Sequence, residues 1–380
     1  MKFIEFFAGA GLINLGIRCD GWECLLANDI CQDKKETYIA NFGKNHFHLG
    51  DIWNLAEQPD LISDEADLYT ASFPCTDMSL AGERRGLQGK ESATLNALFE
   101  IVQHKKNKGK NPKIIMLENV QGFLTAHHGQ DIQYTVQRLN QLGYVVDIIE
   151  LDAVRFTPQS RARIFLFGVQ KEHASAVMTV KTGDILDPWF SLVENNSTLR
   201  TDKIKKIFME NGGFEWGAFN IPLPPPAKNN LSSVIDTTEN SWWNEERKNH
   251  LYNQMNKNHQ DTISVLMKSR NPFYGTIYRR TRNGKPCAEL RIDGIAGCLR
   301  TPRGGSSKQI LVRAGLGTWS ARLLSPREYA RLQGVDDSFI LPSSDNKAYF
   351  AMGDAVCVPA ISFISKHILT PAIRRINARK

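Results

Sequence analysis

Short apolar runs alternate with amphipathic stretches through the first 170 residues. Stretches 94–105 and 132–142 carry apolar residues at helical spacing and predict helices between strands. The runs that predict strands are Phe3–Phe7, Glu23–Ala27, Leu68–Phe73, Ile114–Leu117, Val145–Leu151 and Ile164–Val169. This alternation predicts an α/β domain with a largely parallel sheet. Ligands of such sheets bind at the carboxyl ends of the strands, so the residues after each run are candidates for chemistry.

The strand–helix rhythm stops after residue 170. The Leu-Pro-Pro-Pro run at 223–226 predicts an extended linker, and 244–260 predict a helix beside Trp242 and Trp243. The apolar stretch 355–376 predicts a helix that packs back on the first domain. A helix from Pro326 is expected to bridge the two domains, and a pair between Glu328 and Arg331, which are spaced at i,i+3 on it, is the alternative role for these charges. The predicted domains are a catalytic domain of 1–170 plus 345–380, a smaller inserted domain of 171–322, and a bridging segment of 323–344.

Positive charge is concentrated in the predicted insert. The chain has a net charge of +7, whereas residues 171–322 carry 22 Lys and Arg against 14 Asp and Glu, a balance of +8. Within 268–322 there are 12 basic residues and only two acidic ones, Glu289 and Asp293. Such a basic block predicts a nucleic-acid-binding surface, although a solvated face of mixed sign is the alternative.

Several classes of protein do not fit the sequence. The seven cysteines include no C-x-x-C pair and no zinc-ligand spacing, which argues against a disulfide framework and a metal site. No apolar run reaches the roughly 18 residues of a membrane helix. The N-terminus starts as a strand, with Glu5 in it, and does not resemble a signal peptide. We therefore expect a cytosolic protein.

The first three strand ends carry residues of the kind that bind a nucleoside. Gly9 and Gly11 follow the first run and permit a tight turn close to a ligand. Asp29 follows the second run, where a carboxylate commonly binds ribose hydroxyls, and Asp51 offers a further acid. Each acid taken alone is more often a helix N-cap. Together they indicate a cofactor that contains adenosine.

The next strand ends carry residues suited to nucleophilic and acid–base chemistry. Cys75 lies where the run 68–73 breaks, and a thiolate there is a strong nucleophile, although a buried, inert cysteine is the alternative. Glu118 follows Ile114–Leu117 and is placed to donate a proton to a base nitrogen. Arg161 and Arg163 alternate before the last strand, where they can hold an anion or a loop carbonyl, or form a surface salt-bridge ladder.

Taken in order, these motifs resemble the DNA cytosine-5 methyltransferases of bacterial restriction–modification systems. The motifs are Phe-Ala-Gly-Ala-Gly, Phe-Pro-Cys, Glu-Asn-Val, Gln-x-Arg-x-Arg, the run 324–334 and Gly-Asp-Ala-Val at 353–356. The resemblance covers roughly 1–170 and 320–380. It implies a Rossmann-like fold that binds S-adenosylmethionine, with an inserted target-recognition domain. Asp354 departs from the family, which usually has Asn at this position.

The resemblance also implies roles for individual residues. Cys75 would attack C6 of the cytosine, Glu118 would engage N3 and the exocyclic amine, and Arg161 and Arg163 would orient the base and the catalytic loop. The residues implied to bind S-adenosylmethionine, which leaves as S-adenosylhomocysteine, are Phe7, Ala8, Gly9, Gly11, Leu12, Asp29, Ile30, Asp51, Ile52, Pro74, Leu95, Asp354, Ala355 and Val356. No metal is implied.

Double-stranded DNA is the implied partner, with the target base flipped out of the stack. The protein is expected to be a monomer without a membrane partner, and a cognate endonuclease would act as a separate protein. The residues expected to contact DNA are Ser79, Arg84, Arg85, Arg280, Arg282, Arg300, Arg303 and Lys308. The alternatives are a tRNA cytosine-5 methyltransferase, a DNA-binding regulator with an inactive catalytic domain, and a nicotinamide-dependent Rossmann enzyme.

Overall fold

The computed structural model describes residues 1–74, 94–183, 187–228, 230–301 and 307–379. The chain divides into two compact units. Unit 1 comprises Met1–Leu151, Ala162–Pro224 and Ala360–Lys380, and unit 2 comprises Asp152–Arg161 and Pro225–Pro359. The expected inserted domain of 171–322 is therefore divided between the two units, and 345–359 belong to unit 2. The assignment of DNA recognition to 171–322 stays a prediction.

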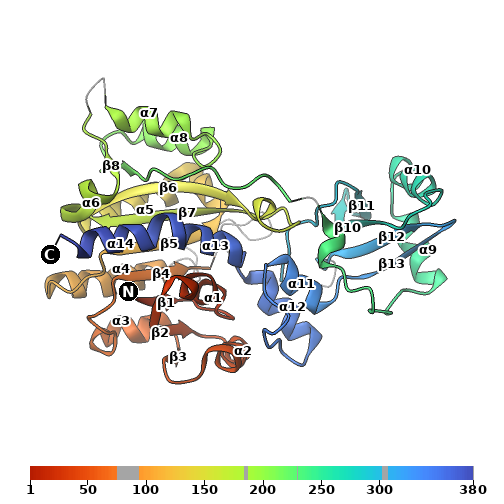
Figure 1. The fold of residues 1–380 in the computed structure, drawn as a ribbon, viewed down its shortest axis with the longest axis horizontal. Helices are drawn as coiled ribbons and strands as arrows, with labels where there is room; N and C mark the ends of the chain where they lie inside the picture. Colours follow the sequence, from red (N-terminus) through yellow and green to blue (C-terminus); the bar gives the residue numbers. More distant parts are fainter. Residues whose placement is uncertain (75–93, 184–186, 229, 302–306, 380) are drawn as a thin grey trace. The chain divides into compact units, whose positions relative to one another are not determined.

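A seven-stranded sheet forms the centre of unit 1, in the order β3-β2-β1-β4-β5-β7-β6 (Figure 1). Its strands are β1 Lys2–Phe6, β2 Glu23–Asp29, β3 Phe47–Leu49, β4 Leu68–Ser72, β5 Ile114–Val120, β6 Tyr144–Asp152 and β7 Ala162–Gln170. The described pairings among β1 to β5 are parallel, and β7 pairs with β5 antiparallel. The predicted α/β fold is confirmed, and all six predicted strands are present.

The helices of unit 1 cover the sheet and bury its central strands. β4 and β5 are buried along almost their whole length, as is typical of parallel strands covered on both faces. The predicted helices 94–105 and 132–142 correspond to α4 and α5. The helices are α1 Leu12–Ile17, α2 Gln32–Phe42, α3 Ile52–Glu57, α4 Thr94–Asn107, α5 Gln130–Gln141, α6 Lys171–Val177, α7 Pro188–Asn195, α8 Asp202–Glu210 and α14 Thr370–Asn377.

The segment 171–224 packs on unit 1 through the outer strand β6. Val146 of β6 forms a β-bridge with Trp216, and the rings of Trp189, Phe208 and Trp216 form a buried cluster. The Arg200 guanidinium donates to Asp147 at 2.6 Å, and both side chains are fully buried. A buried ion pair of this kind fixes the position of the segment, because an unpaired charge there would be costly.

The C-terminal part of the chain returns to the N-terminal part within unit 1. Ser362 Oγ donates to the Gly16 carbonyl at 3.0 Å, and Trp22 Nε1 donates to Thr370 Oγ1 at 2.8 Å. By length and composition alone, the stretch Asp345–Asn377 could cross a membrane, which the sequence analysis did not expect. However, 67% of its most apolar window is buried, and helical structure is interrupted at 355–357. Burial of this extent is typical of core helices.

Unit 2 contains a four-stranded antiparallel sheet in the order β11-β10-β12-β13. The strands are β10 Phe273–Arg282, β11 Lys285–Arg291, β12 Ile310–Gly315 and β13 Thr318–Leu323, with helices α9 Glu245–Asn253, α10 Lys257–Leu266, α11 Pro326–Leu332 and α12 Asp345–Asp354. The single helix predicted over 244–260 is wrong. The chain forms two helices there, because Asn256 caps a new helix with a side-chain bond to the His259 amide.

The alternative role considered for Glu328, a pair with Arg331, is also wrong. Glu328 receives two hydrogen bonds from the Arg322 guanidinium, both at 2.7 Å, and both side chains are fully buried. Arg331 pairs instead with Asp337. Glu328 also completes a capping box with Ser325 at the start of α11. Its carboxylate accepts from the Ser325 amide and therefore points back toward the helix N-terminus.

Candidate active site

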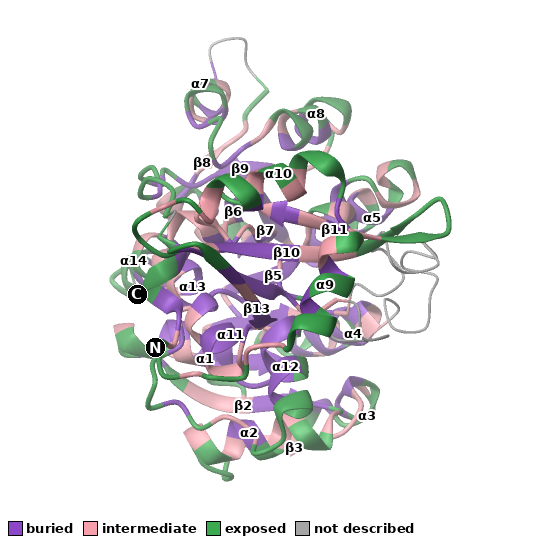
Figure 2. Ribbon diagram, turned by 90° about the vertical axis from the view of Figure 1, so that its right-hand side faces the viewer, coloured by how far each residue is buried: buried purple, intermediate pink, exposed green. Residues whose placement is uncertain are grey.

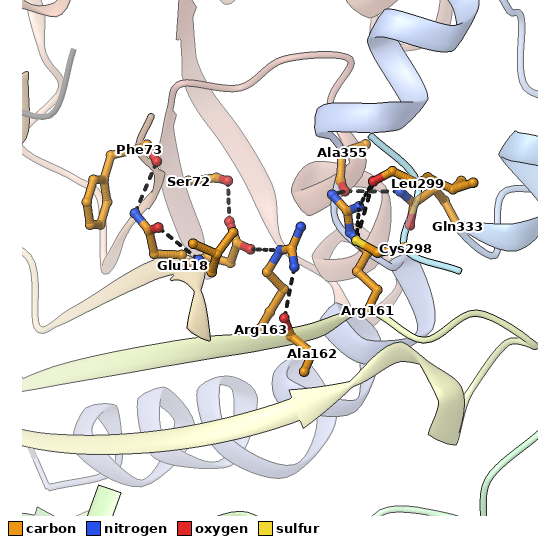
Figure 3. Close-up of polar contacts among 12 residues, drawn as sticks. Ser72, Phe73, Glu118, Arg161, Ala162, Arg163, Cys298, Leu299, Gln333 and Ala355 are labelled. Atoms are coloured by element: carbon orange, nitrogen blue, oxygen red, sulfur yellow. Dashed lines mark hydrogen bonds and ion pairs between the residues drawn. The ribbon is translucent and has the colours of Figure 1, made fainter. Parts of the chain in front are cut away.

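Neighbouring strand ends bring a carboxyl group and a guanidinium group together in unit 1. Ser72 at the end of β4 lies opposite Glu118 of β5 and donates a hydrogen bond to its Oε2 (Figure 3). Arg163, from β7, places Nε 3.1 Å from Glu118 Oε1. The side chains of Glu118 and Arg163 are only 6% and 16% exposed, so the Glu118 carboxyl group is held in place with little access to water. Cys75 lies outside the described residues, one position after Pro74.

Asn119 fixes the strand end that leads toward Cys75. Its side-chain amide donates to the Phe73 carbonyl at 3.3 Å, and the Phe73 ring packs edge-on against Phe123. The chain that leads to Pro74 is thus tied to the same strand that carries Glu118.

Arg161 makes contacts of a different kind within unit 2. Its guanidinium donates to the carbonyls of Leu299 at 2.8 Å, Gly353 at 3.1 Å and Ala355 at 2.6 Å (Figure 3). The residue is only 3% exposed. These bonds tie together two backbone segments far apart in the sequence. The role toward the base that the resemblance implies for Arg161 stays a prediction, whereas its contacts in the structure are those of a residue that fixes backbone.

The loop after β1 is tied to the end of β2. The Gly9 amide donates to Asp29 Oδ2 and the Cys31 amide to Asp29 Oδ1, both at 2.8 Å. Phe7 and Gly9 both have φ of 57°, a conformation that only glycine adopts readily. A Cβ at Gly9 would have only Lys34 Cδ within reach, at 4.0 Å, so one side of this loop is open. Ile30, beside Asp29, is 69% exposed.

Gly11 is required for a different reason. It has φ of 84°, and a Cβ there would lie 2.4 Å from Phe42 Cε2 and 2.8 Å from Tyr38 Cδ2. The start of α1 therefore rests directly on the rings of α2. Leu12, the first residue of α1, is buried beside it.

Glu5 is a functional candidate that was not predicted from the sequence. Glu5 lies within β1 and is 1% exposed, and among the described residues neither of its carboxylate oxygens has a hydrogen-bond partner. Burial raises its pKa well above the usual 4.5, an effect that the nearby Asn14 amide only partly offsets. The sequence signal that could have identified Glu5 is a charged residue inside an otherwise apolar strand. A buried acid without a partner is unfavourable unless a ligand pairs with it.

The remaining predicted cofactor residues lie in both units. Asp51 caps α3 by accepting from the Trp53 amide at 3.0 Å, which is the alternative role considered for it, while Ile52 and Leu95 are buried. Asp354 is the last residue of α12 in unit 2, and Ala355 and Val356 follow it. Their predicted contacts with a cofactor stay predictions. Among the described residues, no group of three His, Cys, Asp or Glu side chains is arranged to hold a metal ion.

The predicted DNA-binding residues fall into two sets. Ser79, Arg84, Arg85 and Arg303 lie outside the described residues. Arg280 and Arg282 share the carboxylate of Glu289, and Arg300 donates to the Tyr278 hydroxyl at 3.2 Å. Lys308 donates to Asn346 Oδ1 at 2.8 Å and lies over the Tyr349 ring, and partial burial lowers its pKa. Contact of any of them with DNA stays a prediction.

Comparison with known proteins identifies the family. The family described as C-5 cytosine-specific DNA methylase matches residues 1–370. The chain belongs to this family. The resemblance in the ordered motifs is confirmed, and with it the class of enzyme, a DNA cytosine-5-methyltransferase.

Individual relatives agree with this membership over nearly the whole chain. The Type II methyltransferase M.HpaII of Haemophilus parainfluenzae is 27% identical over 97% of this chain and 88% of its own length. M.HhaI of Haemophilus parahaemolyticus is 26% identical over 97% of this chain and 94% of its own length. The Dnmt2 methyltransferase of S. pombe shares the fold, with a TM-score of 0.60 and 18% identity over 98% of this chain and 99% of that one.

Proposed function

We propose that this member of the family methylates a specific duplex sequence as the modification enzyme of a restriction–modification system, through a covalent bond between Cys75 and cytosine C6. The observation that carries the proposal is the rigid Glu118–Arg163 pair beside the strand that leads to Cys75. A target cytosine must leave the duplex to reach these groups. We further propose a monomer in the cytosol that meets a cognate endonuclease only through their common DNA site.

Each residue has a distinct part in the proposed reaction. The Cys75 thiolate adds to C6, which makes C5 enamine-like and nucleophilic. Glu118 donates to N3 and accepts from the exocyclic amine, so that it stabilises the charge that develops in the ring. Arg163 holds the Glu118 carboxyl in place. Once C5 carries the methyl group, loss of the C5 proton and breakage of the S–C6 bond restore the ring and release the thiolate.

The residues of unit 1 fit S-adenosylmethionine as the cofactor. When bound, it supplies an electrophilic methyl group. The buried carboxyl of Glu5 would pair with its ammonium group, and the open side of Gly9 would admit its methionine part. Asp29 and the exposed Ile30 would hold the ribose and the adenine. Pairing with an ammonium would remove the cost of the uncompensated acid in β1.

Substitution of the nucleophile tests the proposal directly. Cys75→Ser should abolish methyl transfer to duplex DNA, because an alcohol at neutral pH cannot supply a comparable anion. Binding of S-adenosylhomocysteine, measured by calorimetry, should be unchanged. Wild-type protein with cofactor should also form a denaturant-stable adduct with duplex DNA that contains 5-fluorocytosine. Methylation by the serine variant, or tritiated methyl transfer to tRNA but not to DNA, would overturn the proposal.

A further inference from the structure

The β10–β11 hairpin of unit 2 presents an exposed two-stranded ribbon. Arg282 pairs with Lys285 across a two-residue turn, in which Asn283 and Gly284 have φ of 49° and 73°. Positive φ at both positions is typical of a type I′ turn, which matches the twist of the flanking strands. Residues 280–286 are all exposed (Figure 2). A two-stranded ribbon of this kind has the width to enter the major groove of DNA.

One carboxylate organises the arginines on the polar face of this ribbon. Alternation places Tyr278, Arg280 and Arg282 on the same face, and Glu289 lies directly opposite Tyr278. Arg280 Nη2 lies 2.7 Å from Glu289 Oε2. Arg282 donates to Oε1 from Nε at 2.9 Å and from Nη2 at 2.7 Å. Both guanidinium groups are therefore oriented while their side chains remain 45% and 60% exposed.

The Tyr278 ring contacts two arginines of the same cluster. The Cζ atoms of Arg280 and Arg300 each lie 5.5 Å from the centroid of its ring. Contacts of this kind are favourable between a cation and an aromatic face. Between residues 278 and 291 the chain has five basic residues and a single acid, Glu289. A surface that only attracted phosphates would not be expected to contain a carboxylate such as Glu289.

We infer that this face reads guanine in the major groove, with Arg282 as the base-contacting residue and Glu289 as the residue that positions it. The inference rests on the proposed methylation of duplex DNA. An arginine fork matches the O6 and N7 acceptors of guanine, and every duplex with a target cytosine offers guanines. A carboxylate in a surface that binds DNA lowers non-specific affinity, because it repels phosphates. Its presence is explained if Glu289 orients the Arg282 guanidinium, since ordering a side chain before binding lowers the entropy cost of the contact.

A randomised duplex library tests the inference. Wild type and two variants would methylate the library with S-adenosylmethionine, and bisulfite sequencing would report the preferred context. Arg282→Lys keeps the charge but loses the fork, and Glu289→Gln keeps the shape but loses the charge. Each variant should lower the preference for guanine about tenfold to a hundredfold at one or two positions of the site, and leave the other positions unchanged.

Asp261→Asn is the matched control, because Asp261 is an exposed acid of unit 2 that pairs with Lys257 at 2.9 Å. It should keep the wild-type context. An unchanged context in both test variants would overturn the inference, and so would an equal loss at every position or a rise in methylation with the same pattern, as expected of phosphate contacts alone. A wild-type enzyme that labels no duplex at all would overturn the proposed function itself.

Discussion

At the scale of single residues, the candidate site depends on charged groups held with little water. Glu118 was predicted from its place after an apolar run, and its partners Ser72 and Arg163 come from the two neighbouring strands. Sequence order alone could not give these partners, because they depend on the order of the strands in the sheet. Glu5 was missed for the related reason that its isolation follows from three-dimensional burial.

Substitution of Glu118 distinguishes its chemical role from its structural role. Glu118→Gln should slow methyl transfer by about 10²–10⁴-fold, since positioned proton donors contribute this much to rate. Single-turnover transfer of labelled methyl to duplex DNA measures the effect. Ser72→Ala, which removes only one hydrogen bond to the same carboxyl, is the control and should have a much smaller effect. A near-wild-type rate for Glu118→Gln would remove Glu118 from the mechanism.

Glu5 should also make stability depend on pH. Because its folded-state pKa is raised, the folded protein binds more protons than the unfolded chain above about pH 4.5. The free energy of unfolding should therefore fall as pH rises through this window, by at most about 1.4 kcal/mol per pH unit. Glu5→Gln should flatten this slope, raise stability at pH 7 in urea titrations and weaken binding of S-adenosylhomocysteine. An unchanged slope would contradict the assignment.

At the scale of elements, the sequence predicted the central strands better than the peripheral ones. Runs such as Ile114–Leu117 are apolar throughout because helices cover both faces, and such runs are easily recognised. β3 was indicated only by the acid Asp51 that follows it, because it has only three residues. β10 and β11 were missed because their exposed positions carry Arg, Thr and Lys, which were interpreted only as a DNA-binding composition.

The junction of β1 and α1 gives a test at this scale. Gly11→Ala should destabilise the protein by about 1–3 kcal/mol more than Gly21→Ala, because overpacking in a close contact has this cost. Both glycines have similar φ, 84° and 81°, but only a Cβ at Gly11 would meet neighbouring rings, whereas Gly21 has nothing within 4 Å. Urea unfolding of the two variants measures the difference. Equal losses would mean that backbone strain alone decides the residue at Gly11.

At the scale of the whole molecule, the described part of each unit contains a fully buried ion pair, Arg200–Asp147 in unit 1 and Arg322–Glu328 in unit 2. The Arg200–Asp147 pair was not predicted because its partners are 53 residues apart, and Arg322–Glu328 was not predicted because Glu328 was considered only as a partner of Arg331. The two pairs allow a comparison of the units, since all four side chains have an exposed fraction of zero.

Loss of either arginine should weaken its own unit. Arg200→Ala and Arg322→Ala should each cost about 3–5 kcal/mol, because each leaves an unpaired buried carboxylate. Hydrogen exchange measured by mass spectrometry should show faster exchange mainly within the unit that carries the change. Faster exchange over both units in both variants would show that the chain unfolds as one cooperative block.

The return of the chain to its N-terminal strands has a consequence for synthesis. Unit 1 is built from residues at the start of the chain and from residues after 360, joined by bonds such as Trp22 to Thr370. During translation, the first strands of unit 1 therefore lack their last packing helices until residues 225–359 of unit 2 have been synthesised. During that interval the surface that later buries Ile373 and Ile376 of α14 has no native cover, so nascent chains stalled before residue 360 should bind chaperones that recognise exposed apolar segments.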